Sequence, residues 1–454
     1  MLQLSLICQV LLPIINASHI NIFADLCKSF LCNPYKITTR SLSRRSNYSL
    51  RHIFRFLSLP NIRWIAMRLS LFKHFIYQEN QHYVAIIDEV VEAKSGHCSY
   101  GLSHFYSSIA QKTINSVCFF NLCFVNVATK IAYSIGTEQV IFTEKDKERI
   151  AVQKQALKEG KERAKKGEKL AKGRKKGTKN KTEKKSNDTT SFRTFKTLWD
   201  NVITETKNYL PKMKITHLLA DSKYATQYYI DTIASVGCFL ISKLNRNACL
   251  YEVYMHEEGE KKGKGRPKKY GKKIDFKNLD KKYFKETIVK DGQKQDIYQM
   301  QTYSQSIKNT ILNVVIIIKK NDKSNDSFSI LFSNDTSLTH TQIMDYYQMR
   351  FQIEFEFRDA KQMLGLSDFK NYKKVNLTNF VNLIFTMCLI SKILLEDYRV
   401  YYNKPKMSLA DLKNIFHARF RGETIIKFLG ISDNNNFYLQ KIKDFIPNDL
   451  INND

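Results

Sequence analysis

The sequence lacks several features that would place it in a common protein class. None of its nine cysteines forms a C-x-x-C pair, and the two closest pairs, Cys27 with Cys32 and Cys118 with Cys123, are five residues apart. A zinc site is therefore not expected. Scattered cysteines are typical of reduced, mostly buried thiols, and they predict a cytoplasmic protein and not a secreted disulfide scaffold.

A basic leader and a clean apolar run are also lacking. Residues 1–18 are apolar but carry no basic residue ahead of the apolar stretch, so we interpret them as a core helix and not a secretory signal. The most apolar stretch, 379–395, contains Asn382 and Lys392. It predicts a buried helix and no membrane span.

Acidic residues are too few to balance the basic ones. The 454-residue chain has 73 lysines and arginines against 43 aspartates and glutamates, a net charge of +30. This surplus predicts a polyanionic partner, nucleic acid first and an anionic membrane second. Because 43% of the residues are hydrophobic, the chain has material for a large folded core and two or three domains.

The order of the patterns predicts an α/β fold with helical regions at both ends. From residue 82 onward strands rich in Val and Ile appear, and the strand–helix–strand pattern at 213–244 is typical of α/β proteins. We expect five segments: a helical N-terminal region at 1–78, a core at 79–244 and 336–400, a basic mobile arm within it at 144–190, a β-rich insertion at 245–335 and a helical C-terminal region at 401–454.

The N-terminal region contains a basic pair of short predicted helices at 37–57. Its arginines would face outward, while Leu42, Ile53, Phe54 and Leu57 would face inward. The pair resembles a helix-turn-helix, whose second helix enters a major groove of DNA. An ordinary basic helical hairpin explains the pattern equally well.

The basic arm holds about a third of the net charge. Between residues 144 and 185 there are 18 lysines and arginines and 7 acidic residues. GRKKGT at 173–178 and GRPKKY at 265–270 resemble hooks that enter the minor groove of A·T-rich DNA, although an electrostatic tether is the simpler interpretation. Under either interpretation the DNA-binding side chains are Arg174, Lys175, Lys176, Arg266, Lys268 and Lys269.

Two aspartates stand at the ends of predicted apolar strand segments. Asp88 follows YVAII, and Asp221 follows THLLA. A carboxylate there can project into a site held by a rigid sheet. Asp is also common at such positions simply as a turn or cap residue, which is the simpler explanation for either aspartate alone.

A third carboxylate comes from YYQMRFQIEFEFRDAK, residues 346–361, which predicts a helix. Glu356 lies about 200° around the helix from Glu354, on the opposite face. A solvated salt-bridge ladder through Arg358 is the alternative, but the aromatic residues argue against full exposure, and we expect Phe351 and Phe355 to pack on the sheet. Four side chains share one stripe of this helix: Tyr347, Arg350, Glu354 and Lys361.

The stripe resembles the YREK signature of a branch of bacterial insertion-sequence transposases, which are DDE enzymes with a ribonuclease H-like core. IIDEVVEAKSGHCSYGLSHFY (86–106) is similar to the family's first-aspartate block, and LLADSKYATQYYIDTIASVGCFLISKLNRNACLY (218–251) to its second. GRPKKYG (265–271) resembles a short motif in the family's insertion. The resemblance extends from about residue 80 to 400, and the blocks occur in the family's order.

The resemblance implies cut-and-paste DNA transposition by a ribonuclease H-like mixed-sheet core. It implies that Asp88, Asp221 and Glu354 are catalytic and bind two Mg²⁺ ions, for which Mn²⁺ substitutes, because hard oxygen ligands suit these cations. Tyr347, Arg350 and Lys361 would bind DNA phosphate beside them. The expected partners are double-stranded DNA, as terminal inverted repeats and target, and a second copy of the chain, with no membrane and a location at the bacterial nucleoid.

One family feature is missing, and two other functions stay open. Some relatives hold a flipped base with a tryptophan of the insertion, but Trp64 and Trp199 both lie outside 245–335. Tyr251, Tyr254 or Tyr270 would have to replace it. The alternatives to a transposase are a nuclease of the same fold that cleaves without joining, and an inactive or domesticated DNA-binding protein.

The charge surplus predicts steep salt sensitivity of DNA binding. Because many phosphates would be neutralised, affinity for a labelled duplex should fall by about 10³-fold or more between 50 and 200 mM salt. Fluorescence anisotropy measures this. A flat response over this range would contradict the basic arm as a DNA contact.

Overall fold

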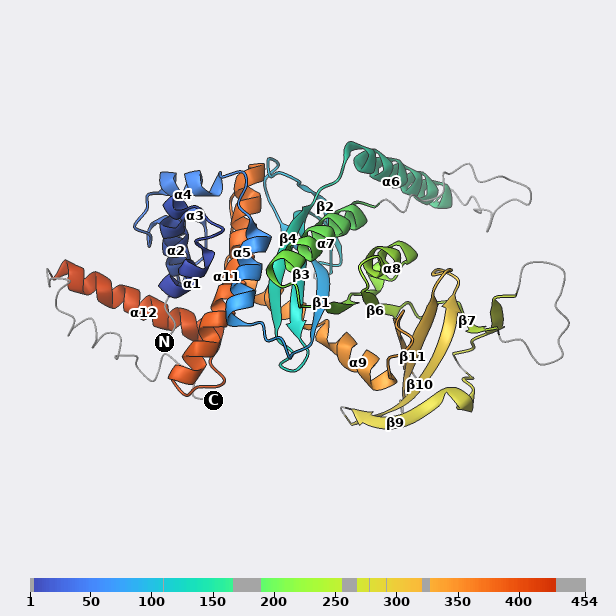
Figure 1. Cartoon of the computed structure of the whole chain (residues 1–454). Helices are drawn as coiled ribbons and strands as arrows, with labels where there is room; N and C mark the ends of the chain where they lie inside the picture. The colour runs from blue at the N-terminus through green and yellow to red at the C-terminus, as the bar shows by residue number, and fades with distance from the viewer. Residues whose placement is uncertain are drawn as a thin grey trace.

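The computed structural model describes residues 4–108, 110–165, 189–254, 268–276, 278–290, 292–320 and 327–429. Figure 1 shows three parts: helices at one end, strands of a sheet in the middle and further strands at the other end. It is thus a mixed α/β protein, as the patterns predicted, and its described strands belong to one large sheet.

The described strands form one sheet of twelve. Its order is β2-β3-β1-β5-β6-β12-β11-β10-β7-β8, with β4 also paired to β3 and β9 to β10. The strands are β1 (Tyr83–Ala93), β2 (Ser103–Ser107), β3 (Lys112–Asn126), β4 (Ala132–Val140), β5 (Ile215–Leu219), β6 (Phe239–Leu244), β7 (Leu250–Val253), β8 (Tyr270–Lys273), β9 (Phe284–Lys290), β10 (Gln293–Ser304), β11 (Ile311–Lys319) and β12 (Ser327–Ser333).

The first half of the sheet changes strand direction at β1. This strand pairs antiparallel with β3, which pairs antiparallel with β4. On its other side β1 pairs parallel with β5, and β5 parallel with β6. Residues 83–87 of β1 are all buried, because the strand lies in the middle of the sheet with both faces covered.

The second half of the sheet is antiparallel and comes from the region predicted as an insertion. Strand β12 pairs antiparallel with β6, and β11, β10 and β7 follow. These strands therefore continue the same sheet. The yellow strands in Figure 1 lie away from the N-terminal helices.

Helices cover the sheet and form the opposite end of the molecule. Helix α11 packs against β4 and against α5, and α7 packs against β4 as well. The helices are α1 (Leu4–Leu11), α2 (Ala17–Leu31), α3 (Thr39–Ser43), α4 (Leu50–Leu57), α5 (Trp64–Phe75), α6 (Glu144–Lys165), α7 (Thr190–Tyr209), α8 (Gln227–Ala234), α9 (His340–Met349), α10 (Gln352–Gln362), α11 (Lys374–Tyr401) and α12 (Leu409–Phe428), with short 3₁₀ turns at Ser222–Tyr224 and Lys281–Tyr283.

Helix α11 is the apolar helix that the sequence predicted as buried. Its length and composition would suit a membrane span, but 89% of its most apolar window is buried inside the protein. Protein therefore already covers its apolar surface. Seven of the nine cysteines are buried as well, and all are free thiols, as expected.

Arg68 on α5 ties the helices to the sheet although it is fully buried. Its guanidinium donates to Thr386 Oγ1 at 3.0 Å and to the backbone and side-chain oxygens of Asn382 at 2.8 and 2.7 Å, all on α11. It also donates to Ile135 O and Thr137 Oγ1 on β4. Burial lowers the pKa of Arg68 to about 9, so the group stays charged at neutral pH and is stabilised by these five acceptors.

Arg68→Met should lower the free energy of unfolding by about 3 kcal/mol, because it leaves buried oxygens without donors. Urea denaturation monitored by circular dichroism measures this. The control is Arg55→Met, since Arg55 is exposed on α4 and its loss should change stability by less than about 0.5 kcal/mol. Equal shifts for the two variants would contradict the role of Arg68.

Candidate active site

The pairing of β1 with β5 brings the two predicted aspartates side by side. Ile86 is paired with Leu219 in this parallel ladder. Asp88 and Asp221 each lie two residues further along and therefore at the same level, but Asp88 is inside β1, which continues to Ala93, whereas Asp221 follows the end of β5. Asp221 caps the 3₁₀ turn Ser222–Tyr224 by position, but its side chain makes no capping hydrogen bond. The Asp221 carboxylate therefore does not serve as a cap of this turn.

Arg350 lies among all the predicted acidic side chains. Its Nη1 is 3.7 Å from Asp88 Oδ2, and its Nη2 donates to Glu354 Oε1 at 3.1 Å. Burial alone would lower the pKa of Arg350, but Tyr347 and the carboxylates of Asp88, Asp221 and Glu354 together raise it. All four of these predicted residues thus favour the charged form of the Arg350 guanidinium.

The Asp88 carboxylate is in an electrostatically unfavourable position. Burial raises its pKa to about 6, although a hydrogen bond from the Glu89 N–H and the charge of Arg350 oppose the shift. The neighbouring charge of Asp221 raises the pKa further. A buried carboxylate beside a second acidic side chain favours an additional cation.

The donor chemistry fits a hard divalent cation. Carboxylate oxygens are the ligands that Mg²⁺ and Mn²⁺ prefer, and Asp88 and Asp221 both offer them. In the described part of the chain no three His, Cys, Asp or Glu side chains already stand close enough to enclose a metal ion. The reason at this site is that Glu354 is directed to Arg350, which a cation would have to displace.

The predicted helix 346–361 is not continuous. It consists of the end of α9 and the start of α10, joined by a tightened turn at Arg350 and Phe351. In this turn hydrogen bonds run three residues back, from Phe351 N to Gln348 O and from Glu354 N to Phe351 O. Both residues keep right-handed helical dihedrals, so Tyr347, Arg350 and Glu354 still share one side.

Glu356 faces the opposite way from Glu354, as helical phase predicted. It is fully buried, and its carboxylate forms an ion pair with Lys392 on α11. Burial raises the pKa of Glu356 against the lowering effect of Lys392. The alternative salt-bridge ladder is only half present, because Arg350 reaches Glu354 whereas Arg358 pairs with Asp359 at 3.1 Å.

The expectation that Phe351 and Phe355 pack on the sheet was wrong. Their side chains are 48% and 37% exposed. They pack edge-on against each other with ring centroids 5.3 Å apart, and Arg358 lies over the Phe355 ring. The buried face of α10 uses Ile353, Glu356 and Phe357 instead, because the buried ion pair fixes which face points inward.

Lys361 lies near the same strand as Asp88 but has a partner in the protein. Its Nζ is 2.7 Å from Glu92 Oε1 and donates to Val91 O at 3.2 Å. Glu92 is buried on β1 and also accepts from Ser367. The expected contact with DNA phosphate stays a prediction for Lys361.

The predicted DNA-binding residues of the insertion stand among tyrosines. Lys268 Nζ lies 4.7 Å from the centre of the Tyr254 ring, and Lys269 Nζ lies 4.4 Å from that of Tyr303. The Tyr270 ring contacts those of Tyr251 and Tyr303. This end of the sheet is therefore a surface of aromatic rings and lysines. Arg174, Lys175, Lys176 and Arg266 lie outside the described residues.

One ion pair at the site was not foreseen. Glu89, next to Asp88, pairs with Lys223, two residues after Asp221. It links the strand that carries the first aspartate to the turn that carries the second. Glu89 is one residue after Asp88 and Lys223 is two residues after Asp221. Once the two aspartates are known to lie side by side, the pairing of Glu89 with Lys223 can therefore be predicted.

Comparison with protein families finds a match to a family model described as DDE superfamily endonuclease, over residues 20–306. The match covers more than half of the 454 residues. It includes Asp88 and Asp221 and ends before Glu354. No curated protein matches the chain.

The two glutamates of α10 should differ in their effect on stability. Glu356→Gln should lower the free energy of unfolding by about 3 kcal/mol, because Lys392 is left buried without a countercharge. Glu354→Gln should change it by less than about 1 kcal/mol, because Glu354 is partly exposed. Urea denaturation of both variants tests this.

The double variant Glu356→Met with Lys392→Met is the control. It should be more stable than Glu356→Gln alone, since neither buried charge is left unpaired. A double variant less stable than the single one would show that the pair does not act as proposed.

Proposed function

The chain belongs to the DDE superfamily of endonucleases, and from that premise we propose that it is a cut-and-paste DNA transposase of the YREK-signature branch. The observation that carries the proposal is the pairing of Ile86 with Leu219, which sets Asp88 beside Asp221 while Arg350 joins Glu354 to them. Asp88 and Glu354, from distant parts of the chain, thereby contact one guanidinium, and the charge of Asp221 acts on it as well.

The strand order supports a ribonuclease H-like core. Three antiparallel strands, β4-β3-β1, continue into the parallel strands β5 and β6. The strands between residues 245 and 335 separate the second aspartate from Glu354 in sequence, as the resemblance implies for a β-rich insertion. The tightened turn between α9 and α10 keeps Tyr347, Arg350 and Glu354 on one side, whereas Lys361 pairs with Glu92.

Asp88, Asp221 and Glu354 would hold divalent metal ions, Mg²⁺ with Mn²⁺ as a substitute. When bound, two such ions activate the attacking oxygen and stabilise the leaving oxygen of a phosphodiester. Arg350 holds Glu354 in place beforehand and supplies positive charge next to the reacting phosphate. Tyr347, whose ring lies 5.9 Å from the Arg350 guanidinium carbon, lines the same side and would contact DNA phosphate.

The proposed reaction has two stages on DNA. Hydrolysis of one strand at a terminal inverted repeat leaves a 3′-OH. This hydroxyl then attacks the opposite strand, giving a hairpin, or a phosphodiester of the target DNA. Two copies of the chain would hold two transposon ends together, at the nucleoid in the cytoplasm.

Positive charge outside the site supports a duplex as the substrate. The net charge of +30 exceeds what a small anionic substrate requires. Lys268 and Lys269 add cations beside tyrosines that contact each other at the far end of the sheet. Arg174, Lys175, Lys176 and Arg266 are proposed contacts of the same kind.

Cleavage of a labelled terminal-repeat duplex with Mg²⁺ should depend on Glu354 and not on Glu356. Glu354→Gln should lower the cleavage rate by more than about a hundredfold. Substitution of residues that only hydrogen-bond to metal ligands already lowers metal affinity or activity by about 10–100-fold. Glu356→Gln should remain near normal when assayed at a temperature where circular dichroism shows it folded. Similar rates for the two variants would refute the assignment.

The same assay separates a transposase from a nuclease that cleaves without joining. A transposase should convert the nicked end to a hairpin, or join it to a second unlabelled duplex. Products that stop at the nick would favour the plain nuclease, whose active site would be the same.

A further inference from the structure

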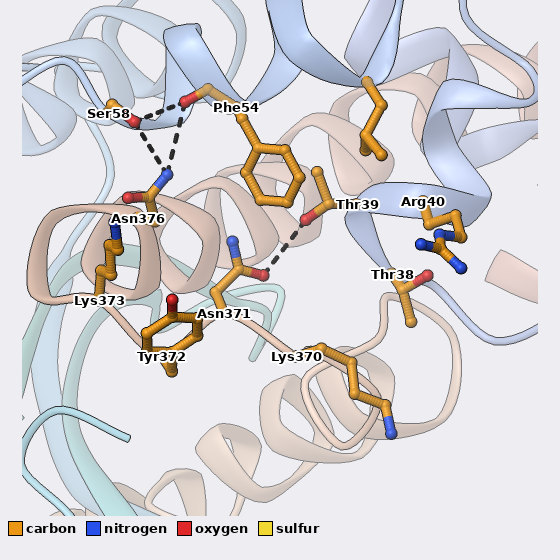
Figure 2. A pocket seen from close by; sticks show the side chains of 11 residues that line it. Thr38, Thr39, Arg40, Phe54, Ser58, Lys370, Asn371, Tyr372, Lys373 and Asn376 are labelled. Carbon is orange, nitrogen blue, oxygen red and sulfur yellow. Dashed lines mark hydrogen bonds between the residues drawn. The ribbon is translucent and has the colours of Figure 1, made fainter. Parts of the chain in front are cut away.

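A cavity of about 690 Å³ lies away from the carboxylates, between the N-terminal helices and the start of α11. Its walls come from α3 and α4 on one side and from residues 370–376 on the other. Pockets of this size accommodate an organic group as large as a nucleotide. Figure 2 shows the side chains that line it.

Two aromatic rings of this cavity are exposed. Phe54 is 42% exposed and Tyr372 is 53% exposed. The expectation that Phe54 faces inward was therefore wrong, whereas its neighbours Ile53 and Leu57 are buried. Exposed rings in a cavity offer faces on which a planar group can stack.

Between these rings lies an amide with an unused hydrogen-bonding atom. Asn371 is only 6% exposed, and its Oδ1 accepts from Thr39 Oγ1 at 3.2 Å. Its Nδ2 has no partner among the described residues. Figure 2 shows this nitrogen directed into the cavity, on the side of the Phe54 ring. A buried donor without a partner destabilises the protein, and a ligand acceptor would relieve this.

The rim of the cavity is positively charged. Arg40, Lys370 and Lys373 line it, and none of the lining residues is acidic. A second cavity of about 490 Å³ shares Thr38, Lys370, Asn371 and Tyr372 with the first and adds Lys36 and Lys94. Its single acid, Asp368, accepts from the Ile37 N–H. The two cavities thus adjoin, and cationic side chains line both of them; we call the two together the cationic groove.

The groove continues from the strand that carries Asp88. Lys94 follows β1 directly, and its Nζ donates to Phe369 O at 3.0 Å, next to Lys370. Six residues of extended chain separate Asp88 from Lys94, a span of about 20 Å. Glu92, paired with Lys361, lies between them. A DNA strand covers that span with about six nucleotides at 3.4 Å each.

We propose that the first cavity binds one unpaired nucleotide of the DNA substrate, away from the reacting phosphate. The base lies against Phe54 and Tyr372, and the Asn371 amide donates to an acceptor on its edge. Arg40, Lys370 and Lys373 bind the adjoining phosphates. The inference rests on the proposed function for the identity of the substrate as DNA.

Preference for an unpaired base tests the proposal. Fluorescence anisotropy compares two labelled duplexes that differ only in one unpaired adenine. The full-length protein should bind the duplex with the unpaired adenine about tenfold more tightly. Phe54→Ala and Tyr372→Ala should each remove most of this preference and retain binding to the paired duplex. Both residues are exposed, so the variants should fold.

Tyr401→Ala is the matched control, because Tyr401 is 56% exposed on α11 outside the lining of the cavity. It should keep the full preference. With 2-aminopurine in place of the unpaired adenine, binding should quench the probe in the wild type and in Tyr401→Ala but not in Phe54→Ala. Equal affinity of the wild type for the two duplexes, or a preference that survives in both cavity variants, would overturn the proposal.

The cleavage assay keeps the two proposals apart. Normal Mg²⁺-dependent cleavage without a preference for the unpaired adenine would refute the nucleotide cavity alone. Such a preference without cleavage of the terminal-repeat duplex would support the cavity and refute the transposase function. Glu354→Gln should lose cleavage and keep the preference, since Glu354 does not line the cavity.

Discussion

The buried ion pair between Glu356 and Lys392 sets the geometry on which the candidate site depends. Rotating α10 about its axis would leave one of these two charges inside the protein without a partner, at a cost of several kcal/mol. With Glu356 held inward, Glu354 must face the other side, toward Asp88. The position of the buried Glu356 therefore determines where the partly exposed Glu354 points. Of the two, only Glu354 faces the candidate site. The adjoining Arg350 contacts both Asp88 and Glu354.

This constraint works because α11 is itself fixed to the sheet. Arg68 connects α11 to β4 through five neutral oxygens, and Lys392 donates to Ala132 O at the start of the same strand. The sheet thus fixes the position of α11, α11 fixes that of α10, and α10 fixes that of Glu354. Asp88 and Asp221 are positioned differently, by the parallel pairing of β1 with β5. A site built from a central strand, the end of the neighbouring strand and a braced helix can hold its carboxylates close together.

Local sequence patterns predicted the elements that carry the site, and long-range contacts decided the rest. Val- and Ile-rich runs were sufficient for β1 and β11, since buried strands need little else. Helical phase separated Glu354 from Glu356, but it could not identify Lys392 as the partner 36 residues away. The exposure of Phe351 and Phe355, and the pairing of Lys361 with Glu92, depend on which face the buried pair turns inward. The short strands β2, β7 and β8 were missed because four or five residues carry too little periodicity.

Site-specific backbone cleavage by bound Fe²⁺ maps the metal site without DNA. Fe²⁺ would replace Mg²⁺ in the full-length protein, and ascorbate with peroxide would generate hydroxyl radicals at the ion. If Asp88, Asp221 and Glu354 form one metal site, mass spectrometry should find cuts close to all three residues, each suppressed by excess Mg²⁺. Cuts near Asp88 and Asp221 without any near Glu354, or cuts that Mg²⁺ does not suppress, would contradict the account.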